Sequence, residues 1–225
     1  MKRFAIIFAM LMGITLSGCL VSSIHPFFKP GDKIFNPSLN GNWVDEDSCI
    51  WVIEPRITTK GFMGESYQDS TYAITYYEDD GAIASLQGTL FELNGQHYVD
   101  FFPEPDKQHT SSEMASLHHV PVHTLARIHF SDDEVMLFWF GEEWLNKLFD
   151  ENRIRIDHEK VTFTSHYESN ILTAETEDLQ KFIMKYMNDE KTSEEIEKAF
   201  AYQEETDEHV FLKLKPYNGT VPSNR

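Results

Sequence analysis

Short runs rich in β-branched and aromatic residues alternate with turn signals between about residue 40 and residue 140. Runs of this composition are typical of β-strands, and tight turns between them join neighbouring strands in antiparallel pairs. The strongest turn signal is Asn94-Gly95, because a two-residue hairpin turn needs positive φ values that Asn and Gly adopt readily. The sequence therefore predicts an antiparallel sheet of consecutive hairpins. The strands expected in this part of the chain are Cys49–Arg56, Thr71–Glu78, Ile83–Leu93, His97–Val99, Val122–Phe130 and Val135–Phe140.

The hydrophobic pattern within the runs indicates how deeply each strand is buried. Val122–Phe130 alternates between apolar and polar residues, which is typical of a strand with one buried face. Val135–Phe140 is apolar at every position, which indicates a strand buried on both faces. Further strands are expected at residues 153–157, 160–165 and 209–215.

Three helices are predicted in the second half of the chain. One begins at Glu142, and a second at 174–188 has apolar residues at the helical spacing from Leu179 to Met187. A third begins near Thr192, which resembles a capping box with Glu195. The predicted fold class is α+β and mainly antiparallel β. It is a barrel or curved sheet of about eight strands with two or three added helices.

The first residues have the organisation of a secretory signal peptide. Lys2 and Arg3 are followed by an apolar stretch from Phe4 to Leu16, and two small residues then precede Cys19. The stretch is too short for a transmembrane helix, which needs about 20 apolar residues.

Leu16-Ser17-Gly18-Cys19 resembles the lipobox of bacterial lipoproteins. This resemblance implies a diacylglyceryl group on the Cys19 thiol, cleavage before Cys19 and acylation of the new amine. Leu20 stands where inner-membrane lipoproteins tend to have Asp. The resemblance therefore implies a lipid anchor in the outer membrane, with the domain facing the periplasm. An ordinary signal peptide with a chance cysteine is the alternative.

The net charge of −18 makes nucleic acids and anionic membrane surfaces unfavourable partners for this chain. The chain has 19 Lys and Arg against 37 Asp and Glu, and the loss of Lys2 and Arg3 on cleavage would change −18 to −20. Such a chain is a poor match for nucleic acid, which is bound through basic side chains. It would also be repelled by anionic lipid headgroups, so we expect membrane attachment through the acyl chains on Cys19 and not through a basic patch.

These features divide the chain into four expected parts: a signal peptide (1–18), a lipidated tether (19–38), a single β-rich periplasmic domain (39–217) and a disordered tail (218–225). The tether is predicted from Pro26, Pro30 and Pro37 together with Gly31. Its aromatic residues would nevertheless favour packing against a surface.

Gly41-Asn42-Trp43 precedes the first long predicted strand and resembles the Gly-x-Trp entry of lipocalin-like β-barrels. The resemblance implies a barrel with Trp43 closing one end and an interior that holds a small apolar ligand. The alternative is that Trp43 is an ordinary core residue.

Half of the ten histidines lie in one short segment, at positions His109, His118, His119, His123 and His129. Neutral imidazoles bind transition metals, so this segment is a candidate metal site. Pro121 disfavours the helix that would place two of them on one face, and the HExxH order of many zinc enzymes is absent from the sequence. Solvated loop histidines are the favoured interpretation, and no metal or cofactor is predicted.

No sequence motif of nucleophilic catalysis is found, and no catalytic residue is predicted. Cys49, the second of the two cysteines, follows Asp45, Glu46 and Asp47. Acidic neighbours disfavour a reactive thiolate, so the sequence favours a buried strand cysteine.

Three functions remain open. The first is a non-enzymatic envelope lipoprotein that binds a small apolar ligand in its barrel-like domain. The second is an interaction or assembly lipoprotein whose contact residues are Phe27, Phe28 and the apolar stripe from Leu179 to Met187. The third is a metal-dependent enzyme that uses the histidine-rich segment 109–129.

Overall fold

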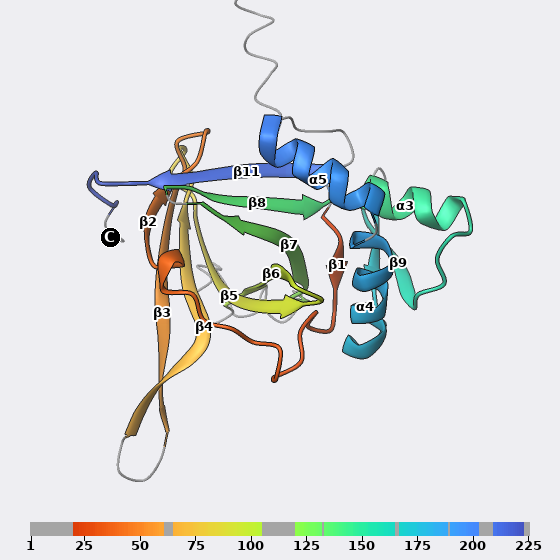
Figure 1. Cartoon of the computed structure of the whole chain (residues 1–225), viewed down its shortest axis with the longest axis horizontal. Coiled ribbons are helices and arrows are strands. Elements are labelled where there is room, and N and C mark those ends of the chain that lie inside the picture. Colours follow the sequence, from red (N-terminus) through yellow and green to blue (C-terminus); the bar gives the residue numbers. More distant parts are fainter. Residues whose placement is uncertain are drawn as a thin grey trace, which may run out of the picture.

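Eight antiparallel strands form a closed β-barrel in the computed structural model, which describes residues 20–60, 65–104, 120–131, 133–164, 167–188, 190–202 and 209–222 (Figure 1). Pairing between the first and last strands of the order, with Tyr98 opposite Arg127, closes the barrel. In order around the barrel, the strands are β6 (Gln96–Pro103), β5 (Ile83–Leu93), β4 (Glu65–Tyr77), β3 (Ile50–Lys60), β2 (Gly41–Val44), β11 (His209–Pro216), β8 (Val135–Phe140) and β7 (His123–Phe130).

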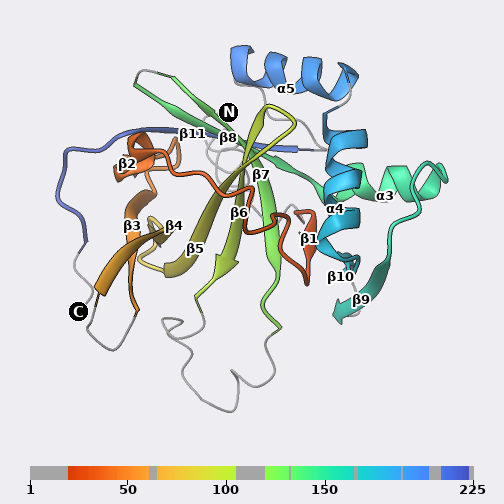
Figure 2. The ribbon, with the colours of Figure 1, turned by 60° about the horizontal axis from the view of Figure 1, so that its bottom comes forward.

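A second group of elements covers one side of the barrel, as Figure 2 shows. Three short strands continue the sheet from β7, namely β1 (Ser22–Ser23), β10 (Tyr167–Leu172) and β9 (His158–Thr164). The helical elements are the 3-10 turn η1 (Pro37–Leu39), α3 (Glu142–Asp150), α4 (Thr176–Phe182), its π-helical continuation η3 (Ile183–Met187) and α5 (Glu190–Tyr202). A closed, mainly antiparallel barrel with added helices confirms the predicted fold class, and it is the architecture that the lipocalin resemblance implies.

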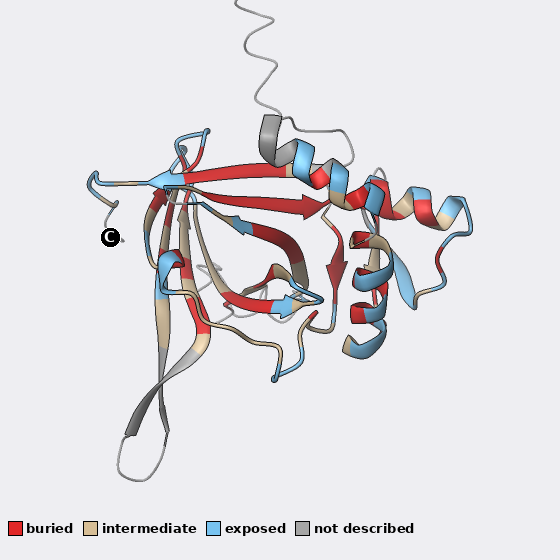
Figure 3. Cartoon of the chain, in the orientation of Figure 1, coloured by how far each residue is buried: buried red, intermediate tan, exposed pale blue. Residues whose placement is uncertain are grey.

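Strand β8 is buried at every position, as its unbroken apolar run predicts (Figure 3). Successive side chains of a strand point to opposite faces of the sheet. The barrel interior therefore receives Val135, Leu137 and Trp139. The outer face, against the helices, receives Met136, Phe138 and Phe140.

Aromatic side chains occupy the interior of the barrel. The ring of Trp139 lies 5.4 Å from that of Phe101 and 6.5 Å from that of Trp51, measured between centroids. Trp43 is also buried there, and its indole N–H donates to the carbonyl oxygen of Leu39 at 3.0 Å. Interlocked rings of this size contribute strongly to the core because each removes a large apolar area from water.

The outer core lies between the barrel and the helices. The apolar stripe predicted for the second helix packs here, since Leu179, Ile183 and Met187 have no exposed surface. Trp144 of α3 contacts Phe182 of α4, with 5.9 Å between ring centroids. The helices are thus held by the outer face of the barrel.

Residues 20–38, which the sequence assigns to a tether, pack against the barrel. Leu20 forms a β-bridge with Gly141, and strand β1 pairs with both β7 and β10. Phe27 is fully buried, and its backbone N–H donates to the Asp100 carboxylate at 2.9 Å. The other oxygen of Asp100 lies 2.7 Å from Nδ1 of His123. These contacts make the segment part of the folded domain.

The structure agrees with most of the expected strands and differs at four places. The Asn94-Gly95 turn is confirmed, with φ values of 52° and 75°. Residues 153–157 form no strand, although their side chains alternate between exposed and more buried positions. The reason is that their backbone has no ladder partner among the described strands. The short strands β1, β2 and β10 were not expected. Their residues are partly polar, and neighbouring strands determine their pairing.

Truncation of one interior ring is expected to destabilise the barrel. Trp139→Ala removes a side chain that is only 7% exposed, and the loss of a buried aromatic ring costs about 3–5 kcal/mol. Val120→Ala is the control, since Val120 is 74% exposed and its loss should change the free energy of unfolding by less than about 0.5 kcal/mol. Urea unfolding followed by circular dichroism measures both. Equal stability of the two variants would contradict a packed interior.

Asp100→Asn is expected to gain stability relative to the parent chain as the pH rises. Burial raises the pKa of the Asp100 carboxyl above its ordinary value of 3.8. The folded chain therefore binds this proton more tightly than the unfolded chain, so parent stability falls as the pH rises from 3.8 through the raised pKa. The side-chain amide introduced by Asp100→Asn does not titrate, so the variant lacks this pH-dependent loss of stability. Unfolding free energies of both chains at about pH 4 and about pH 7 test this. A pH-independent difference between them would refute it.

Candidate functional site

The structure places the residues that the sequence singles out in different parts of the molecule. Cys19 lies outside the described residues, as do His109, His118 and His119. His123 is held by Asp100 at the start of β7, and His129 lies near the other end of that strand. Within the described ranges, no group of three His, Cys, Asp or Glu side chains is arranged to hold a metal ion.

Cys49 is a buried free thiol, as predicted. Desolvation by burial raises the pKa of the thiol, and the nearby Asp45 carboxylate raises it further. A raised pKa keeps the sulfur protonated and weakly nucleophilic. Cys49 therefore belongs to the core in chemical as well as structural terms.

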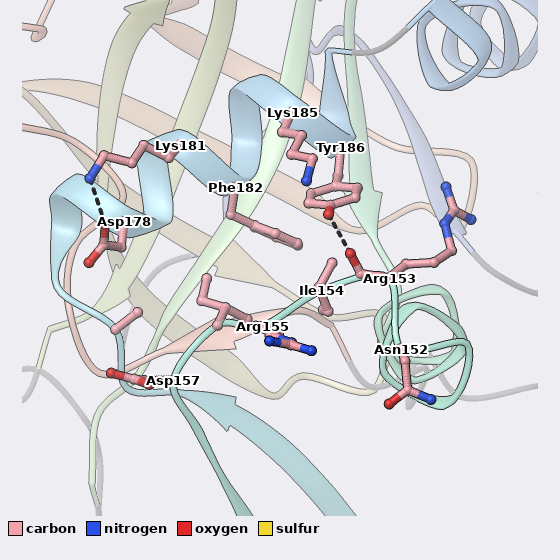
Figure 4. Close-up of a pocket in the computed structure, with 12 residues that line it drawn as sticks. Asn152, Arg153, Ile154, Arg155, Asp157, Asp178, Lys181, Phe182, Lys185 and Tyr186 are labelled. Atoms are coloured by element: carbon pink, nitrogen blue, oxygen red, sulfur yellow. Dashed lines mark hydrogen bonds and ion pairs between the residues drawn. The ribbon is translucent and has the colours of Figure 1, made fainter.

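A cleft lies on the outside of the barrel. It lies between the extended segment 152–157 and the helix formed by α4 and η3, and its volume is about 440 Å³ (Figure 4). Small-molecule sites typically have volumes of about 300–1,000 Å³. We call it the α4 cleft.

One side of the α4 cleft is built by the chain that leaves helix α3. Asn152 adopts a φ of 54°, which turns the chain after the helix, and the backbone N–H of Arg153 donates to the Leu148 carbonyl at 2.9 Å. The segment then runs extended to Asp157, whose carbonyl accepts from the N–H groups of Thr173 and Ala174. Both ends of the segment are thus fixed by backbone hydrogen bonds.

The other side comes from the outward face of α4 and η3. Because Leu179 and Ile183 face the barrel, residues on the opposite face point to solvent. Lys181 and Lys185 are four residues apart and lie on this exposed face. The helix therefore buries its apolar stripe and presents two ammonium groups at the cleft.

The floor of the α4 cleft is apolar. Ile154, Ala174 and Phe182 line it and are buried. The rings of Phe182 and Tyr186 lie 5.5 Å apart, and the Tyr186 hydroxyl donates to the Arg153 carbonyl at 2.5 Å. This hydrogen bond joins the two sides of the cleft.

The charged side chains of the lining are mainly basic. Four cations and two carboxylates line the cleft, a net of +2 on a chain whose total is −18. Two of the cations are already paired. Lys181 lies 2.8 Å from Asp178, which raises the pKa of Lys181, and Arg153 lies 3.3 Å from Glu151.

The other two cations, Arg155 and Lys185, have no carboxylate within ion-pair distance among the described residues. They project from opposite sides of the cleft, as Figure 4 shows. The Lys185 ammonium lies 4.8 Å from the centroid of the Tyr186 ring, a cation–π contact. The arrangement can bind a molecule that has an apolar part and a negative charge.

The sequence alone does not single out this site. It predicts a strand at residues 153–157, and a strand prediction gives the two arginines in that segment no particular role. A useful signal was nevertheless present. Two arginines and two lysines at helical spacing are conspicuous in a chain with almost twice as many acidic as basic residues.

Comparisons with known proteins give no similar protein whose ligand could be compared with this site. No protein-family model matches the chain, and neither the curated proteins nor the solved structures compared with it give a match. The chemistry of the α4 cleft therefore rests on its own residues.

Within the residues that the structure describes, no helix combines the length and the hydrophobicity that a membrane crossing requires.

Proposed function

We propose that the chain is a lipid-anchored, non-enzymatic lipoprotein of the bacterial outer membrane, with its domain facing the periplasm, and that this domain binds a small apolar ligand. The sequence Leu16-Ser17-Gly18-Cys19 behind a 13-residue apolar stretch carries the proposal. Acyl chains on Cys19 would hold the protein at the membrane, since more than one chain is needed for stable anchoring.

The packing of residues 20–38 bears on how such an anchor would hold the domain. Leu20 directly follows Cys19 and bridges Gly141, the residue before helix α3. The first described residue after the proposed lipidation site is therefore held at the domain, next to the start of α3.

The α4 cleft is the better place for the ligand. The lipocalin resemblance implies a ligand inside the barrel, but Trp51, Phe101 and Trp139 pack against one another there. The α4 cleft lies on the outside of the barrel and has an apolar floor. We therefore place the ligand on the outer side of the barrel, against α4.

The two other functions have less support. The contact residues of the interaction hypothesis are used inside the protein, since Phe27 and Leu179 are fully buried. The enzyme hypothesis depends on the segment 109–129, most of which lies outside the described residues, and His123 is engaged by Asp100.

Cys19→Ala is expected to abolish lipid modification and signal processing in cells. The thiol is the atom that would receive the diacylglyceryl group, so incorporation of labelled palmitate should fall to background while the unprocessed chain accumulates. Cys49→Ala is the control and should label like the parent, because its thiol is buried. Equal palmitate labelling of Cys19→Ala and the parent would remove the central claim.

Ile156→Asp is expected to abolish binding of the uncharged apolar probe N-phenyl-1-naphthylamine. Ile156 lines the α4 cleft and is half-buried, so the carboxylate would place a charge against the apolar part of the ligand. Ile24→Asp is the control, since Ile24 is 42% exposed and lies outside the cleft lining. Probe fluorescence measures binding, and circular dichroism verifies folding. Unchanged binding by folded Ile156→Asp would exclude the α4 cleft as the site.

A further inference from the structure

We propose that the ligand of the α4 cleft is a free acidic amphiphile, a soluble molecule whose carboxylate is bound by Arg155 and Lys185 while its apolar part lies on the floor at Phe182. This inference rests on the proposed function, because it names the ligand class of the same site. It adds a requirement for negative charge that the proposed function does not contain.

Arg155 and Lys185 differ in their ion pairing from several other cations of this chain, which has 37 acidic and 19 basic residues. Basic side chains elsewhere in the described residues that pair with a carboxylate include Arg56, Lys160, Lys198 and Lys213. Arg155 and Lys185 have no such partner among the described residues, although Asp157 and Asp178 line the same cleft. Their complementary charge is therefore available to a ligand.

The geometry of the cleft separates a charged end from an apolar middle. Arg155 projects from the extended segment and Lys185 from the helix, with the Phe182 ring between the two sides (Figure 4). Asp157 lies at the opposite end of the cleft from Tyr186, so an anion would avoid it by binding near Tyr186. A carboxylate there would lie in the positive field of the Arg155 guanidinium and the Lys185 ammonium.

A free acid fits better than the headgroup of a membrane lipid. The chain carries −18, and a surface of this charge is repelled by an anionic bilayer. A small soluble acid needs only the local field of the cleft, which is positive because four cations and two carboxylates line it. Two unpaired cations over an apolar floor therefore indicate a soluble acid with an apolar tail or ring.

The test compares ligands that share an apolar chain and differ in charge. The mature chain 19–225 with Cys19→Ser contains every described residue and is titrated calorimetrically with decanoate and with decyltrimethylammonium. We expect decanoate to bind at least about tenfold more tightly, because only the anion forms charge-assisted hydrogen bonds with the two cations. Decanoate affinity should fall as ionic strength rises from about 0.02 M to about 0.5 M.

A double variant assigns the effect to the two side chains. Arg155→Gln with Lys185→Gln should weaken decanoate binding by about tenfold and change the affinity for the uncharged N-phenyl-1-naphthylamine by less than about twofold. Arg56→Gln with Lys198→Gln is the matched control, because it removes one Arg and one Lys charge outside the cleft. This control should bind decanoate like the parent.

The possible failures are distinguishable. The acidic ligand is excluded, while the apolar site stands, if decanoate and decyltrimethylammonium bind equally well. The same conclusion holds if Arg155→Gln with Lys185→Gln binds decanoate like the parent. If neither decanoate nor the uncharged probe binds, the ligand part of the proposed function falls as well. Flotation with phosphatidylglycerol vesicles that depends on Arg155 and Lys185, without decanoate binding, would assign the two cations to a membrane surface and overturn the proposal.

Discussion

The burial of strand β8 on both faces is the constraint on which the rest of the structure depends. Every residue from Val135 to Phe140 is buried, so the strand needs apolar partners on both sides of the sheet. Inside the barrel, aromatic rings such as Trp51 and Phe101 supply them. Outside, the partners are the helices and the segment around Phe27. The barrel and its helical cover therefore share β8 and form two cores, one on each face of this strand.

The same constraint explains why the candidate site lies outside the barrel. Rings fill the interior, whereas the α4 cleft lies between the extended segment 152–157 and the helix formed by α4 and η3. Because α4 and η3 turn Leu179 and Ile183 toward the barrel, Lys181 and Lys185 lie on the exposed side of the helix and line that cleft. A lipocalin-like barrel thus carries the candidate site in its helical additions, and the placement of Lys185 follows from how the helix is packed.

Local patterns predicted the elements well where the pattern itself decides the structure. The Asn94-Gly95 hairpin needs only two residues with positive φ, and both are present. The apolar run of β8 and the helical stripe from Leu179 also specified which surfaces are buried. Strand β1 was not predictable, because two serines pair only when β7 and β10 flank them. Residues 153–157 show the opposite error, since an alternating pattern does not reveal whether a ladder partner exists.

Neighbouring residues are enough to predict the order of hairpins, the positions of the helices and the Leu16–Cys19 motif on which the proposed membrane localisation rests. The reason is that turns, periodicity and short motifs are local properties. Other features depend on residues far apart in the chain. These are the closure of β6 on β7, the docking of Phe27 against Asp100 and the placement of Arg155 and Lys185 in one cleft. Such contacts form only when packing brings whole elements together. The α4 cleft is therefore a product of the tertiary structure alone.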